Sequence, residues 1–212
     1  NLSLVEAASL PEAFATAFDT AVLHGTSTPF SQFLDQTTKS VELGAHTAAE
    51  GGAWQDLNDA LRLLVKDRKR LTGFVLDDVV EPTLNGSVDS NGRAIFVDQP
   101  PAEDNASPAN GQNSEKRARR GRLMGRPTFM NEGVATTNLT TVVGYAGDWS
   151  QCVWGVVGGI SYDISTEAAV TINGTLTSLW ENNLVAIRAE AEYGFLCNDV
   201  SAFVRLTNLT GS

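Results

Sequence analysis

The stretch that decides the fold lies near the end of the chain. It reads GDWSQCVWGVVGGISYDIS over residues 147–165 and SLWENNLVAIRAEAEYGFLCNDVSAFVRLT over residues 178–207. The first of these sequences predicts strands over 152–157 and 160–164, with Gly158-Gly159 between them. In the second strand Ile160, Tyr162 and Ile164 alternate with small or polar residues, so we expect one face of it to be buried.

The segments on either side of this pair also have β character. Residues 128–130 and 141–145 are strand-like, and residues 170–177 predict a hairpin. That hairpin should turn at Asn173-Gly174, because this dipeptide suits a type I′ turn. Residues 179–193 are compatible with either strand or helix, and residues 195–206 close the chain.

Helices are expected earlier in the chain. Residues 4–23 carry an apolar residue every fourth position from Leu10 to Val22, and Gly25 should stop this helix. Residues 53–70 give the clearest helix. Its apolar stripe consists of Trp54, Leu57, Leu61, Leu64 and Val65, with Asp56, Asp59, Arg62, Lys66 and Lys69 elsewhere. Helices and strands are therefore segregated along the chain, which indicates the α+β class.

Four further segments complete this interpretation. Residues 26–52 are polar and predicted to be mostly loop, whereas residues 74–76 should form a short buried strand. Asp77 or Asp78 can then cap a short helix that runs through Leu84. Residues 97–122 are rich in Pro, Asn, Ser, Gly and Ala with almost no large apolar side chain, which predicts a long exposed loop.

Composition narrows the function classes. The 212 residues suffice for one large domain or two small ones, and the apolar fraction of 42% is that of a globular protein. A formal charge of −10 argues against a protein that coats nucleic acid. No run of about 18 apolar residues suggests a membrane span.

A basic cluster interrupts this acidic sequence. Five of the fifteen basic residues fall within seven positions, and they are Lys116, Arg117, Arg119, Arg120 and Arg122. Nucleic-acid contact is one interpretation of such a run. Given the acidic remainder, we favour a solvated loop, or a loop that pairs with acidic surface on a neighbouring subunit.

Residues capable of catalysis or metal binding are few. Cys152 and Cys197 lie in apolar stretches, as two buried thiols or one disulfide, and His24 and His46 are far apart in sequence. No ligand spacing predicts a zinc site, and no motif combines a nucleophile, a base and an oxyanion hole. We therefore predict no catalytic residue, no metal and no cofactor.

Three blocks together resemble the tailed-phage (or prophage) major capsid family. FVLDDVVEPTLNGSVDSNGRAIF, residues 74–96, is similar to the family's strand, short helix and D-x-x-G-R turn. LMGRPTFMNEG, residues 123–133, is similar to its L-x-G-x-P-V strand entry, with Thr128 where Val is usual. Gly147-Asp148-Trp149-Ser150 resembles the family's GD(F/W)S segment, and residues 178–207 resemble its closing segment.

This resemblance implies a Hong Kong phage-type α+β fold with an axial and a peripheral domain. We expect the axial domain over 20–146 and 194–212, and a partial peripheral domain over 1–19 and 147–193. The family's amino-terminal arm, extended loop and most of its spine helix are expected to be absent from this stretch. The lysine–asparagine cross-link of some relatives is not carried over, because the loop that would hold the lysine is missing. The expected core includes Trp54, Leu57, Leu61, Phe74, Leu76, Phe129 and Phe203.

The function implied by the resemblance is structural. Copies of the chain would assemble as pentamers and hexamers into the icosahedral head shell of a tailed phage or prophage, with a scaffold or head protease as further partners. The shell would enclose the DNA without binding it specifically and without a membrane. The protein would occupy the bacterial host cytoplasm before assembly and the virion afterwards. An encapsulin-type nanocompartment shell is one alternative. A secreted β-rich recognition module, suggested by Asn-Xaa-Thr matches and two cysteines, is the other.

Overall fold

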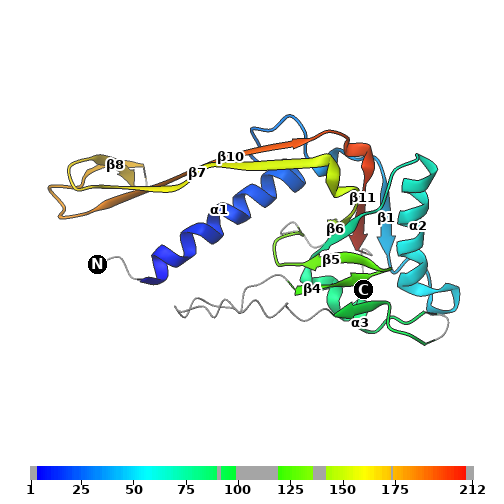
Figure 1. The fold of residues 1–212 in the computed structure, drawn as a ribbon. Helices are drawn as coiled ribbons and strands as arrows, with labels where there is room; N and C mark the ends of the chain where they lie inside the picture. The colour runs from blue at the N-terminus through cyan, green and yellow to red at the C-terminus, as the bar shows by residue number, and fades with distance from the viewer. Residues whose placement is uncertain (1–3, 90–91, 99–118, 136–141, 173, 209–212) are drawn as a thin grey trace, which may run out of the picture. The chain divides into compact units, whose positions relative to one another are not determined.

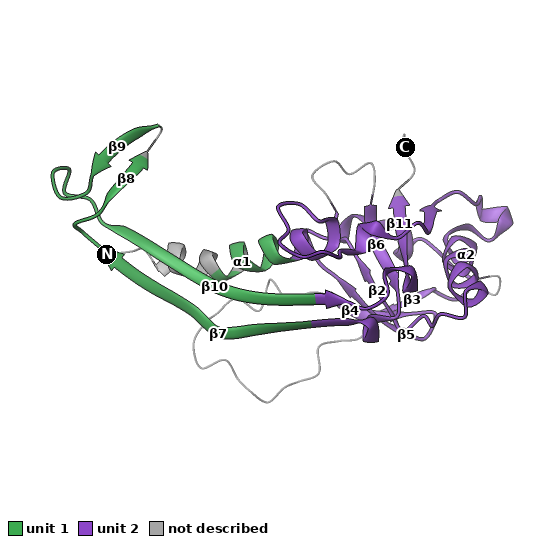
Figure 2. Ribbon diagram, turned by 90° about the horizontal axis from the view of Figure 1, so that it is seen from above, with its two compact units in different colours: residues 1–18, 154–195 green, residues 19–153, 196–212 purple. Residues whose placement is uncertain are grey.

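The chain folds into two compact units. The computed structural model describes residues 4–89, 92–98, 119–135, 142–172 and 174–208. Unit 1 comprises residues 1–18 and 154–195, and unit 2 comprises residues 19–153 and 196–212 (Figure 2). Unit 2 contains most of the buried side chains, whereas unit 1 is built from a long strand pair and a hairpin.

The first helix confirms its prediction. α1 (Leu4–His24) covers the predicted residues 4–23, and it passes from unit 1 into unit 2 along the chain. The helix ends where Gly25 adopts a φ of 71°, with its N–H donating to the carbonyl of Ala21 at 3.2 Å. Glycine is suited to this position because an L side chain rarely adopts a left-handed backbone.

Unit 2 is organised on a mixed seven-stranded sheet of order β1-β11-β6-β2-β5-β4-β3 (Figure 1). The strands are β1 (Ser40–Leu43), β2 (Gly73–Leu76), β3 (Phe96–Asp98), β4 (Arg119–Leu123), β5 (Arg126–Met130), β6 (Val142–Gly147) and β11 (Phe203–Asn208). The pairs β1–β11 and β2–β5 are parallel, and the other neighbours are antiparallel. Segments distant in sequence therefore lie side by side in this sheet.

Helix α2 (Gly52–Lys66) covers part of this sheet and confirms the clearest predicted helix, although it ends earlier than residue 70. It packs against β1 and β11. Leu57 and Leu64 are fully buried, as predicted, but Val65 of the predicted stripe is 59% exposed. The prediction for Val65 was wrong because it lies next to Leu64, so the turn of the helix carries it away from the sheet.

The segment between β2 and β3 follows its prediction. Asp77 precedes a 3-10 helix, η3 (Asp78–Val80), and its carboxylate accepts a hydrogen bond of 3.1 Å from the N–H of Val79. The short helix α3 (Glu81–Asn85) follows, with Pro82 in its first turn, where no backbone N–H is needed. The predicted cap and short helix are both confirmed.

Two loop predictions need correction. Residues 26–52 contain β1 and two 3-10 helices, η1 (Leu34–Gln36) and η2 (Ala48–Glu50). Residues 97–122 are not a loop throughout, since β3 and β4 occupy both ends, and residues 99–118 lie outside the described part of the chain. These short strands have little hydrophobic periodicity of their own. They exist because neighbouring strands supply their hydrogen-bond partners.

Unit 1 is built on β7 (Cys152–Ser165) paired with β10 (Ala186–Cys197). The first two residues of β7 and the last two of β10 belong to unit 2. β8 (Ala169–Ile172) and β9 (Thr175–Ser178) form the antiparallel hairpin predicted at residues 170–177. The two strands predicted over 152–164 are one strand, which runs through Gly158 and Gly159 with φ of 79° and 154°. Residues 186–193, left open between strand and helix, are strand.

Candidate functional site

The GDWS motif forms a packed corner between β6 and β7. The carboxylate of Asp148 accepts hydrogen bonds from the N–H and the hydroxyl of Ser150, at 3.2 and 2.7 Å, and so caps the 3-10 helix η5 (Trp149–Gln151). The indole N–H of Trp149 donates to the carbonyl of Gly73 at 3.0 Å, and its ring meets Phe203 edge to face at 5.2 Å. The motif therefore joins the turn between β6 and β7 to β2 and β11.

The basic cluster is partly committed to contacts inside unit 2. Arg119 pairs with Glu81, and with Asp98 at 3.2 Å, and its guanidinium lies 5.3 Å from the ring centre of Phe96. The hydrogen bonds to Asp98 and to Glu81 raise the pKa of Arg119. Arg119 is thus placed to hold β4 against β3 and α3 rather than to reach outward.

The next two basic residues are oriented differently. Arg120 stacks over the ring of Phe129 at 5.6 Å, and Arg122 donates to the carbonyl of Gly125 at 3.1 Å. Both are exposed. Phe129 itself is 41% exposed, so its prediction as core was wrong: it alternates along β5 with the buried Thr128 and Met130. Lys116 and Arg117 lie outside the described residues.

Unit 1 presents large apolar side chains to solvent. We define the arm surface as the exposed large apolar residues of unit 1. They are Trp154, Val156, Val157, Tyr162, Ile164, Leu176, Trp180, Leu184 and Val185, with exposures from 40% to 75%. The predicted burial of one face of β7 is therefore wrong within this chain, since Tyr162 and Ile164 are 49% and 72% exposed. Exposed apolar surface of this extent marks an interaction site.

Unit 1 has almost no core of its own. Among its described side chains Leu179 alone is buried, at 2% exposure. Phe18 of α1 contacts Trp154, Tyr193 and Phe195, with ring centres 6.3, 5.1 and 6.4 Å apart. A two-stranded pair with one aromatic cluster is marginal in water. The alternating apolar residues of β7 are therefore available to a partner.

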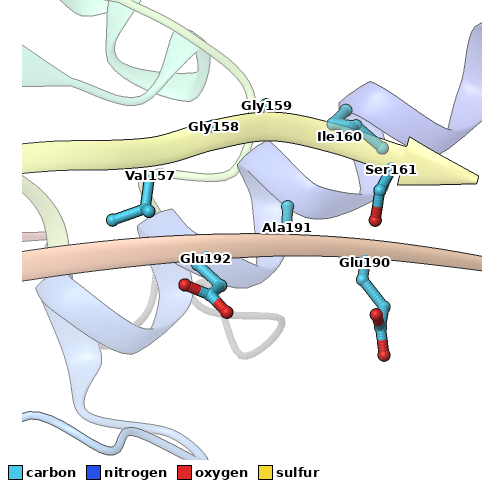
Figure 3. Close-up of a pocket in the computed structure, with 8 residues that line it drawn as sticks. All are labelled: Val157, Gly158, Gly159, Ile160, Ser161, Glu190, Ala191 and Glu192. Atoms are coloured by element: carbon cyan, nitrogen blue, oxygen red, sulfur yellow. The ribbon is translucent and has the colours of Figure 1, made fainter.

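A shallow groove crosses the β7–β10 pair (Figure 3). It encloses about 500 Å³ and is lined by Val157, Gly158, Gly159, Ile160, Ser161, Glu190, Ala191 and Glu192. Glu190 and Glu192 project on the same side of β10, with Ala191 between them, and Arg188 pairs with Glu190 at 3.1 Å. The lining therefore offers two exposed carboxylates and the hydroxyl of Ser161.

His24 is part of a polar cluster that the sequence did not predict. Its Nδ1 lies 2.9 Å from the carboxylate of Asp35, and its Nε2 lies 2.9 Å from the carbonyl of Val134. The hydroxyl of Tyr145 donates to Asp35 at 2.8 Å. Burial raises the pKa of Tyr145 above its usual value, so the phenol remains a hydrogen-bond donor. The cluster joins α1, η1 and β6.

His46 belongs to a second polar cluster in unit 2. The carboxylate of Asp56, fully buried on α2, accepts hydrogen bonds from the N–H groups of Gly44 and His46 at 2.7 and 3.2 Å. The Nδ1 of His46 lies 2.6 Å from the same carboxylate. Asp56 was predicted to lie on the polar face of its helix. It is buried because this loop satisfies its charge.

The two cysteines are unbonded thiols in unit 2, with Cys197 buried and Cys152 half-buried. The hydrogen-bond partners of the histidines do not include them. In the described part of the chain no three His, Cys, Asp or Glu side chains come together as metal ligands. Nor does any helix described here combine the length and apolar character that a membrane span requires.

Sequence and structure comparisons relate this arrangement to known proteins. The family model described as "Phage capsid family" matches residues 7–208. The chain is 44% identical over 202 residues to the probable major capsid protein gp17 of Mycobacterium phage D29, and 45% identical over 207 residues to that of Mycobacterium phage L5. Each alignment covers 93% of this chain, but the chain spans only 59% of each relative.

A solved structure shares the fold. A chain from Mycobacterium phage Ogopogo superposes with a TM-score of 0.67 at 21% identity, covering 98% of this chain and 68% of that one. Fold, sequence identity and the family match over nearly the whole length agree with one another. The chain therefore belongs to the phage capsid family.

Proposed function

We propose that this chain is the shell-forming part of a major capsid protein, which assembles with copies of itself into the icosahedral head of a tailed phage or prophage. The observation that carries the proposal is the arm surface of unit 1, which is apolar, exposed and without a core beneath it. Membership in the phage capsid family supports other copies of the chain as the partner. The nanocompartment and secreted-module alternatives are not favoured by these relatives.

The physics of a shell suits this distribution of apolar residues. A closed shell repeats the same modest contacts many times. Each contact is weak alone, and the shell is held together by their sum. Exposed valines, leucines and tryptophans on a strand pair supply such contacts, since each buried side chain contributes about 1.5–3 kcal/mol. A partner strand or helix on β7 would also complete the core that unit 1 lacks.

The domain assignment is part of the same proposal. Unit 2, with its sheet and buried core, would be the axial domain, and unit 1 would be part of the peripheral domain. Scaffold or head-protease partners, enclosed DNA without specific binding, and residence in the host cytoplasm before assembly also belong to the proposal. The net charge of −10 supports the absence of specific DNA binding, because anionic surface repels the phosphate backbone.

Two exposed valines provide a matched test. Val157→Asp places a charge on the arm surface, where the side chain is 68% exposed, and Val65→Asp places the same charge on α2 of unit 2, where it is 59% exposed. Both variants should fold, because neither side chain is buried. In the full-length protein we expect Val157→Asp to reduce closed shells at least tenfold, since a charge would be desolvated at an interface. Val65→Asp should assemble normally.

Size-exclusion light scattering and negative-stain electron microscopy provide the readout, and circular dichroism verifies folding. Pentamers, hexamers or shells from the unaltered protein, lost only in Val157→Asp, support the proposal. A strict monomer at high concentration, even beside its scaffold and protease partners, would contradict shell formation. Normal shells from Val157→Asp would remove the arm surface from the assembly contacts.

A further inference from the structure

Cys152 and Cys197 face each other across two hydrogen-bonded strands. Cys152 is the first residue of β7 and Cys197 is the last of β10, and the two strands run in opposite directions (Figure 2). The N–H of Asn198 donates to the carbonyl of Gln151 at 2.9 Å, which sets the register at this end of the pair. In an antiparallel pair the residue number rises along one strand while it falls along the other. The pair that follows Gln151 and Asn198 is therefore Cys152 and Cys197.

This register also defines the type of pair. Hydrogen-bonded and non-hydrogen-bonded pairs alternate along an antiparallel ladder, so the position next to Gln151 and Asn198 is non-hydrogen-bonded. Cα atoms in such a pair are about 4.5 Å apart, within the range that a disulfide spans. The Cys197 side chain is also the main influence on Cys152, and it raises the pKa of the Cys152 thiol.

We propose that Cys152 and Cys197 are an oxidation site at which an intrachain disulfide forms and joins β7 to β10 at their unit 2 ends. Within these 212 residues Cys152 and Cys197 are the two cysteines, so this stretch can form one intrachain disulfide. In a reducing compartment the pair remains as thiols, and in an oxidising medium the bond forms.

The chemistry balances with a peroxide as the oxidant. A thiolate sulfur attacks the O–O bond of hydrogen peroxide, which yields a sulfenic acid and, after protonation, one water. The second thiol attacks the sulfenic sulfur, the S–S bond forms, and a second water leaves. Two electrons pass from the two sulfurs to one peroxide. The hydrogen bond from Cys152, with that from the Asp199 N–H, lowers the pKa of Cys197 and favours its thiolate.

The bond would close a loop that contains all of residues 153–196. Cross-linking a loop of this length removes freedom mainly from the unfolded chain. We expect an increase of about 5–15 °C in the unfolding midpoint of the oxidised, unassembled chain over the reduced one. Cys152→Ser should remove the increase, and Cys197→Ala provides a second variant that leaves no polar group in the buried position.

Mass spectrometry of the full-length protein decides the proposal directly, even if a variant fails to fold. After treatment with one equivalent of hydrogen peroxide and non-reducing trypsin digestion, we expect the peptide 123–188, which contains Cys152, to be linked to the peptide 189–205, which contains Cys197. The linked species should carry two hydrogens fewer than the sum of the two peptides and should separate on reduction. Unlinked peptides with free thiols, separate sulfinic acids, or a disulfide between two copies would each overturn it.

Discussion

At the scale of single residues, Asp56 shows how a buried charge can stabilise a loop. Its carboxylate holds the backbone of Gly44 and His46 against α2, and the imidazole of His46 supplies a further contact. A buried carboxylate without such donors would be costly. The loop between β1 and η2 is therefore ordered by a residue that follows it in the sequence.

The histidine in this cluster makes the stability of unit 2 depend on pH. The hydrogen bond to Asp56 raises the pKa of His46 above its value in the unfolded chain. The folded state thus binds the proton more tightly, and the stabilisation is complete below about pH 6.5 and lost as pH rises through the folded pKa. We expect His46→Gln to reduce the free energy of unfolding more at about pH 5.5 than at about pH 8.5.

Urea unfolding of the unassembled chain at both pH values measures this difference. His24→Gln is a comparison in the other polar cluster, and it does not alter the contact between His46 and Asp56. An equal loss of stability in His46→Gln at both pH values would show that the His46 proton makes no contribution.

At the scale of elements, close backbone approach explains why glycine occupies the end of β6. A Cβ on Gly147 would lie 2.5 Å from the carbonyl oxygen of Ala202 and 2.5 Å from the Phe203 ring. The carbonyl belongs to the backbone and cannot rotate away. The first residue of the GDWS motif is thus required by the contact between β6 and the start of β11.

Glycine-to-alanine substitutions test this explanation with an internal control. Gly147→Ala should lower the free energy of unfolding by about 1–3 kcal/mol, because the backbone must shift to relieve the overlap. Gly155→Ala in β7 adds the same methyl group where nothing lies within 4 Å, and it should change stability by less than about 0.5 kcal/mol. Urea denaturation of each unassembled variant gives the values. Similar effects from the two substitutions would contradict the steric explanation.

At the scale of the whole molecule, the described arginines of the basic cluster fall into two groups, one paired inside unit 2 and one exposed to solvent. Arg119 is neutralised by Glu81 and Asp98 inside unit 2, whereas Arg120 and Arg122 are exposed and have no ion pair to a described residue. An interface between subunits would therefore use the latter two, together with Lys116 and Arg117 if those residues reach it. Such exposed charges increase association rates more than affinities.

Neutralising the two exposed arginines should slow assembly of the full-length protein. In Arg120→Gln/Arg122→Gln we expect light-scattering assembly rates to fall several-fold at low salt, with the difference vanishing at about 0.5 M salt as charges are screened. Arg68→Gln/Arg70→Gln is a matched control, because both side chains are exposed on unit 2 and neither forms an ion pair with a described residue. Equal rates for the variant and the unaltered protein would place the cluster outside the interface.

The sequence by itself determined the elements whose signals are local. The helices α1 and α2 follow from apolar periodicity, the Asp77 cap from its side chain, and the β8–β9 hairpin from Asn173-Gly174. Family motifs such as GDWS identified the capsid family, because they are conspicuous within one continuous segment. The basic cluster was also visible in the sequence, although its division between internal and exposed roles was not.

Only the tertiary structure decided features that join distant segments. β1, β3 and the start of β4 form because other strands complete their hydrogen bonds, and the Asp56 and His24 clusters combine side chains from separate elements. Apolar alternation in β7 predicted a buried face, yet Tyr162 and Ile164 are exposed in the single chain. Periodicity shows that one face of a strand is apolar. It does not show whether the residues that bury this face belong to the same chain or to another, because hydrophobic burial is non-directional.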